Sequence, residues 1–204
     1  MLTVLGVVLL VTVLPDRVRL MASWGPMAVG AIVLTPMLGV WGSRGQHRWL
    51  QLERVLTLAF CVVGGVSVVL NLSEVIRTML GGAGQTSGLK LLSSGCAVWA
   101  NNVLVFALLH WQLDAGGPEA RADGKPDFCD WQFPQVVAPE FVRPGWRPVF
   151  MDYLALGFTT ATAFSPTDVL PLTARAKGLM MLESIISLVT IAVVASRAIN
   201  VLGQ

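Results

Sequence analysis

The chain has 204 residues, of which 54% are hydrophobic and only 13% are charged, whereas about 25% of the residues in an ordinary soluble domain are charged. The mean hydropathy is +0.69, and several apolar runs approach or exceed the roughly 18 residues that cross a bilayer. This composition predicts an integral membrane protein. The formal net charge of +2, without a basic cluster, argues against a nucleic-acid partner.

Apolar segments predict an all-α fold with about five membrane spans. In chain order they are Leu2–Leu14, Ala22–Trp41, Val55–Leu72, Leu89–Leu113 and Gly178–Ser196. The first three make up an N-terminal unit over residues 1–88, with polar stretches between the helices. Gly64 and Gly65 in the third segment would let a neighbouring helix approach closely.

The composition changes between the fourth and fifth segments. Residues 114–148 contain six prolines and mixed charges, with no helical or strand periodicity, and this pattern predicts an irregular loop. Its aromatic side chains are suited to the membrane interface, namely Trp131, Phe133, Phe141 and Trp146. The alternative interpretation is a solvated linker.

A short helical pattern follows this loop. It runs from Phe150 to Ala161 and covers only 12 residues, so at about 1.5 Å per residue it would be about 18 Å long, against a hydrocarbon core of about 30 Å. Pro166 and Pro171 prevent its continuation into the last helix, because each removes a backbone donor. We therefore predict a re-entrant half-helix and pore loop, with threonine hydroxyls lining a wet cavity.

The order of these elements resembles the pore module of potassium-channel-type proteins. The matching residues are the threonine pair Thr159-Thr160, the post-filter acid Asp168, and the Pro-x-Thr of Pro171 and Thr173. The channel-like unit is 89–204, with an outer helix (89–113), a polar loop (114–148), a half-helix with its loop (149–172) and an inner helix (173–202). The stretch from Phe158 to Leu202 is also similar to small bacterial polytopic membrane proteins with a channel-like C-terminal half. The resemblance implies a bacterial plasma membrane.

The resemblance also implies an ion path. Its residues would be Thr159, Thr160, Thr162, Ala163, Phe164, Ser165, Pro166, Thr167 and Asp168. Because one pore loop per chain cannot enclose an axis, we expect a homo-oligomer, a tetramer by analogy, within the lipid bilayer. A monovalent or divalent cation would pass through it, with Asp168 concentrating cations at the mouth. No cofactor and no metal site are expected.

One departure from the channel pattern bears on selectivity. Residues 163–167 stand where a potassium filter has Thr-Val-Gly-Tyr-Gly, so both filter glycines are absent. Those glycines permit the backbone that turns each carbonyl toward the ion. We therefore expect either a pore with a filter that is not of the potassium type or a fold that persists without conduction. The second case is a membrane scaffold or accessory subunit whose loop at 128–146 binds a partner. A small transporter is disfavoured, because the hydropathy pattern has no internal repeat.

Polar residues inside the apolar helices suggest contacts between helices. Glu183, Ser187 and Thr190 form one polar stripe on the inner helix, which would face a wet cavity or an ion path. Alternatively, Glu183 lies near the interface and pairs with Arg175, Lys177 or the loop. Asn101 and Asn102 should form hydrogen bonds across helices, and Thr173 is a candidate N-cap for the inner helix.

Enzymatic chemistry finds no support in the sequence. His47 and His110 are isolated, and no metal-ligand spacing or serine elbow is present. We therefore expect a protein that is not an enzyme.

Two criteria for membrane orientation disagree. With five spans and the long loop outside, as in channels, the cytoplasmic basic residues are Arg17, Arg19, Arg77, Lys90 and Arg197, five of the 14. The positive-inside rule favours the opposite orientation. We adopt the channel orientation as the working hypothesis.

Overall fold

The fold is taken from a computed structural model, which describes residues 5–7, 9, 31, 35, 47–80, 88–122, 124, 128–162 and 168–202. The elements in chain order are α3 (His47–Leu80), α4 (Gly88–Leu113), the 3-10 helix η1 (Asp114–Gly116), α5 (Pro118–Ala122), β1 (Trp131–Gln132), α6 (Pro134–Val137), the 3-10 helix η2 (Pro139–Phe141), α7 (Phe150–Thr162), β2 (Leu170–Pro171) and α8 (Ala174–Leu202). The described chain is mostly helical, as the predicted all-α class requires. The first two predicted segments lie almost entirely outside these residues.

Among the described residues, three helices are long and apolar enough to cross a membrane. They are Leu52–Arg77, Leu92–Gly116 and Ala174–Ser196. They support the prediction of an integral membrane protein, because each exceeds the roughly 18 apolar residues that a span requires.

The third predicted segment begins earlier and ends later than its apolar core. α3 covers 34 residues, whereas the apolar run suggests a helix over Val55–Leu72. Residues 47–54 contain arginine, leucine, glutamine and glutamate, which are good helix formers, and no glycine or proline. The polar stretch before Val55 therefore extends the helix.

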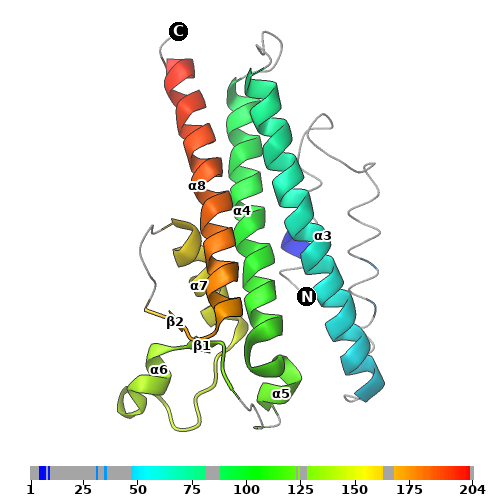
Figure 1. Ribbon diagram of the computed structural model, residues 1–204, viewed down its shortest axis with the longest axis vertical. Coiled ribbons are helices and arrows are strands. Elements are labelled where there is room, and N and C mark those ends of the chain that lie inside the picture. Colours follow the sequence, from blue (N-terminus) through cyan, green and yellow to red (C-terminus); the bar gives the residue numbers. More distant parts are fainter. Residues whose placement is uncertain are drawn as a thin grey trace.

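α4 is the central helix and packs against α3, α7 and α8 (Figure 1). Buried apolar side chains fill the contact between these helices, among them Val68, Val98, Phe106 and Ile186. Gly64 confirms the predicted close approach, because a Cβ there would lie 2.9 Å from a methyl carbon of Val105 on α4. A Cβ at Gly65 would meet nothing within 4 Å.

α7 lies along only part of the length of α8, and the chain then returns to the end of the bundle from which α7 started (Figure 1). The return is fixed by a short antiparallel pairing of β1 with β2, in which Trp131 faces Pro171 and Gln132 faces Leu170. The prediction that residues 114–148 form an irregular loop is therefore wrong in part. These residues contain α5, β1, α6 and both 3-10 helices, because pairing with β2 and packing against α7 order them.

The predicted interfacial position is wrong for two of the aromatic residues. Trp131 and Phe133 are 2% and 3% exposed and pack in one cluster with Tyr153 and Leu156. Their loop folds back onto α7, so burial in the protein replaces burial in the interface. Phe141 is 84% exposed and keeps the predicted accessibility.

Candidate functional site

The sequence-predicted site centres on α7 and the loop that follows it. Two of its threonine hydroxyls donate hydrogen bonds to carbonyls of the same helix: Thr159 to Ala155 at 2.7 Å, and Thr162 to Phe158 at 2.8 Å. Thr160 is buried, and its hydroxyl has no partner among the described residues. α7 therefore brings the threonines to its C-terminal half, with two hydroxyls already bonded.

The predicted filter residues Ala163, Phe164, Ser165, Pro166 and Thr167 lie outside the described residues. Asp168, the next described residue, is exposed.

The predicted polar stripe of α8 faces the interior of the bundle. Glu183, Ser187 and Thr190 are each at most 1% exposed. Ser187 donates a 2.6 Å hydrogen bond to the carbonyl of Ala161, and Ser184 donates one of 3.3 Å to the carbonyl of Thr160. Because the last carbonyls of a helix lack partners within it, α8 supplies a C-terminal cap for α7.

Glu183 lies opposite a histidine that sequence reasoning set aside. Its Oε2 atom is 3.8 Å from Nε2 of His110 on α4, and both side chains are fully buried. The alternative pairing with Arg175 is wrong, since that arginine bonds Asp130 instead. The cross-helix bond predicted for Asn102 is confirmed: its side-chain amide donates to the Glu183 carbonyl at 3.2 Å. Asn101 is buried, and its side-chain oxygen has no partner among the described residues.

A second polar group, which sequence reasoning missed, lies at the end of the bundle where α7 begins. We call it the Asp114–Asp130 cluster, and its residues are Asp114, Arg121, Asp130, Tyr153, Thr173 and Arg175. The Asp114 carboxylate accepts hydrogen bonds from the backbone N–H of Asp130 at 2.8 Å and from the Tyr153 hydroxyl. The start of α7 is thereby tied to the end of α4.

The same cluster ties the start of α8 to the loop. The Asp130 carboxylate accepts hydrogen bonds from the Thr173 hydroxyl at 2.6 Å and from Arg175 at 2.5 Å. The Asp130 carbonyl accepts the N–H of Leu172 at 2.8 Å. Thr173 is also confirmed as the N-cap of α8, because its hydroxyl oxygen accepts the N–H of Ala176 at 3.1 Å.

Electrostatics in this cluster keep the Tyr153 phenol neutral. Burial, reinforced by the charge of Asp114 and the hydrogen bond to it, raises the pKa of Tyr153. Burial lowers the pKa of Arg121, whose guanidinium lies 4.4 Å from the ring centre of Trp111 and 5.1 Å from that of Tyr153. Tyr153 thus acts as a hydrogen-bond donor to Asp114 and as one of the rings that the arginine covers.

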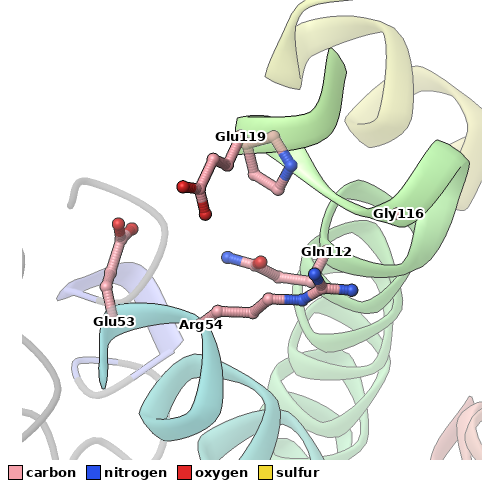
Figure 2. A pocket seen from close by; sticks show the side chains of 6 residues that line it. Glu53, Arg54, Gln112, Gly116 and Glu119 are labelled. Atoms are coloured by element: carbon pink, nitrogen blue, oxygen red, sulfur yellow. The ribbon is translucent and has the colours of Figure 1, made fainter. Parts of the chain in front are cut away.

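A small cavity lies where the start of α3 meets the end of α4. Its volume is about 40 Å³, and its lining is Glu53, Arg54, Gln112, Gly116, Pro118 and Glu119. Figure 2 shows the carboxylates of Glu53 and Glu119 and the Gln112 amide around one space. Gly117 beside it has φ +100°, and a Cβ there would lie 3.4 Å from Cζ of Arg54, so only glycine suits this position. The cavity has room for about one water molecule and contains none of the predicted site residues.

Only part of this arrangement leaves a signal in the sequence. Asn102, Phe106 and His110 are spaced at four-residue intervals, so they share one face of α4, and two of the three are polar in an apolar helix. That spacing could have placed His110 toward a neighbouring helix. Nothing local indicates that the neighbour is Glu183.

Among the described residues, no three side chains of ligating type are grouped to hold a metal ion. Comparisons of the chain with family models, with curated proteins and with solved structures found no match.

Proposed function

We propose that this chain is a pore-loop membrane protein, whose re-entrant segment 149–172 contributes to the path of a homo-oligomeric cation channel with a filter that is not of the potassium type. The observation that carries the proposal is the return of the chain. α7 has 13 residues, about 20 Å of helix against a hydrocarbon core of about 30 Å. Both ends of the segment are held by the Asp114–Asp130 cluster, through Tyr153 at one end and Thr173 at the other.

The way α7 ends also supports a cation as the permeant species. The C-terminal end of a helix carries a partial negative charge, and Ser184 and Ser187 hold this end in place against α8. The exposed Asp168 follows at the other side of the loop. Both features would lower the energy of a cation near the end of α7 or near Asp168.

The re-entrant topology is tested with single cysteines at positions 147 and 173 in a chain without Cys61, Cys96 and Cys129. We expect a membrane-impermeant thiol reagent to label both positions from the same side. Labelling from opposite sides would overturn the re-entrant segment and the pore with it.

Conduction is tested with purified protein in liposomes. We expect potassium or sodium flux that falls several-fold in Asp168→Asn, because the charge at the mouth is lost. The matched control is Asp152→Asn, which removes an acid at the start of α7, where it accepts the N–H of Val149 at 2.7 Å. Native mass spectrometry should show a tetramer. Absence of flux under every gradient would argue against the channel.

The second candidate is a non-conducting scaffold or accessory subunit. It is favoured by the bonded hydroxyls of Thr159 and Thr162 and by the burial of the α8 stripe within a single chain. Its partner surface would be the loop at 128–146, where Phe141 is exposed. A monomer or dimer without flux is the outcome that selects this candidate.

A further inference from the structure

His110 and Glu183 form a buried ionisable pair, which has no role in the proposed pore loop. Both side chains have zero exposure, and Nε2 and Oε2 are 3.8 Å apart, too far for a hydrogen bond. Neither ring nitrogen and neither carboxyl oxygen has a hydrogen-bond partner among the described residues. The imidazole is flanked by the rings of Phe106 and Trp131, with ring centres 6.1 Å and 4.7 Å away. Two ionisable groups are therefore enclosed side by side without a hydrogen-bond partner for their titrating atoms among the described residues.

The other titratable and charged groups on the surrounding elements are engaged elsewhere or exposed. Among the described side chains, those of α4, α7 and the segment before β1 are Asp114, Tyr153, Asp152 and Asp130, each with its own hydrogen bond, and the exposed thiols of Cys96 and Cys129. Those of α8 are Arg175, which bonds Asp130, and the exposed Lys177. Among the α3 side chains that the structure describes, they are Glu53 and Arg54 beside the small cavity, the ion-paired Glu74 and Arg77, and the buried thiol of Cys61. None of these contacts compensates a charge on Glu183 or His110.

Charge balance fixes how many protons such a pair holds. With one proton between them the two groups are neutral together. With none the pair carries a negative charge, and with two a positive one. An uncompensated charge without hydrogen bonds is strongly unfavourable in a protein interior, even after relaxation. The neutral, singly protonated pair is therefore the state that fits this packing.

The Glu183 carboxyl group of the pair also lies against α7. A Cβ at Gly157 of α7 would lie 3.2 Å from Oε1 of Glu183 and 3.2 Å from the carbonyl oxygen of Val103 on α4. No side chain separates the carboxyl group from the α7 backbone. A charge on this carboxyl group would have to be stabilised by water, and water reaches it only if α7 moves away.

We propose that His110 and Glu183 form a proton-binding site that holds one proton, and that the release of this proton to solvent, or the gain of a second, detaches α7 from α4 and α8. The ligand is the proton itself. The inference does not require that the protein conducts ions, since it concerns the packing of α7 alone.

The bound proton is tested by infrared difference spectroscopy of the intact protein in membranes, in H₂O and in D₂O. We expect the C=O stretching band of a protonated carboxylic acid, shifted in D₂O and lost in Glu183→Gln. The matched control Glu74→Gln changes another carboxyl group of a long helix and should keep the band. A band that is unchanged in Glu183→Gln would overturn the proposal. So would a spectrum of the unmodified protein without such a band and without a protonated imidazole.

The coupling to α7 is tested by thiol labelling of Ala161→Cys in a chain without the three native cysteines. Ala161 is 4% exposed, whereas Phe158 on the same helix is 50% exposed, so Phe158→Cys serves as the control. We expect the ratio of the two labelling rates to change by about tenfold or more between about pH 4 and about pH 10, through local opening of α7. Adding both Glu183→Gln and His110→Gln should abolish this change. If the double variant does not fold, His110→Gln alone should reduce the change. A ratio independent of pH with the native pair would overturn the coupling.

Discussion

Two buried polar groups in the same bundle differ in how completely they are hydrogen-bonded. At the end of the bundle, Asp114 and Asp130 each accept several hydrogen bonds from backbone and side chains. Further into the bundle, the carboxyl oxygens of Glu183 on α8 and the ring nitrogens of His110 in the last turn of α4 have no hydrogen-bond partner among the described residues. Both groups connect α4 to α7 and α8.

This difference separates a structural role from a functional one. The bonded carboxylates of Asp114 and Asp130 hold their partners in one arrangement, and the loss of such bonds costs stability. An unsaturated buried group is costly to keep, and in the proposal above the atoms of His110 and Glu183 find partners in water once α7 has moved away. The Asp114–Asp130 cluster therefore fixes where α7 starts, whereas the His110–Glu183 pair determines how firmly α7 is held.

The largest effect on stability is expected from removing the hydrogen-bonded carboxylate of Asp114. Asp114→Ala removes the acceptor for the Tyr153 hydroxyl and for the backbone N–H of Asp130, and each buried donor left without a partner costs about 1–3 kcal/mol. We expect the free energy of unfolding in detergent micelles to fall by about 3 kcal/mol or more. Glu140→Ala, which removes an exposed carboxylate, should change it by less than about 0.5 kcal/mol. Equal effects of the two substitutions would contradict the structural role.

A smaller effect is expected where α7 meets the unsaturated pair. Gly157→Ala places a methyl group 3.2 Å from Oε1 of Glu183 and from the Val103 carbonyl, and such overpacking costs about 1–3 kcal/mol. Gly65→Ala is the matched control, because its methyl group meets nothing within 4 Å. It should stabilise α3 by about 0.5–1 kcal/mol. Thermal unfolding of both variants checks the opposite signs, and a stabilised Gly157→Ala would mean that α7 does not pack this closely.

The smallest effect on stability is expected from Tyr153, and this effect should depend on pH. Tyr153→Phe should cost about 1 kcal/mol at neutral pH through the lost bond to Asp114. Because the pKa of Tyr153 is raised in the folded protein, its contribution is complete below about pH 10, the ordinary tyrosine value. It is lost as the pH rises further, since the unfolded chain ionises first. The stability difference between the two proteins should therefore shrink above about pH 10, and parallel curves would rule out this linkage.

The sequence predicted the parts of the fold that depend on local pattern. The apolar run at Leu89–Leu113 is helical, the short pattern after Phe150 is a short helix, and Thr173 caps α8. Burial of Trp131 could not be predicted, because it depends on pairing with Pro171, which follows α7 in the sequence and is 40 residues away.

The candidate site was predicted less completely. The position of Asn102 follows from a polar amide in an apolar helix, whose hydrogen-bonding groups need a partner. The meeting of His110 with Glu183 depends on the packing of three helices, and one chain's pattern does not specify which faces meet. Asp114 and Asp130 lie in or beside a stretch without periodicity, so no pattern marked them as the residues that organise it.

The two serines of α8 that bond the last carbonyls of α7 also bear on how the protein is made. During synthesis α7 leaves the ribosome before α8, so the carbonyls of Thr160 and Ala161 have no Ser184 or Ser187 to bond. Within a bilayer, unsatisfied backbone groups cost several kcal/mol each. In the re-entrant arrangement proposed above, α7 would therefore reach its final depth only after α8 has been inserted. A chain truncated before Ser184 should leave α7 at the membrane surface or bound to the insertion machinery.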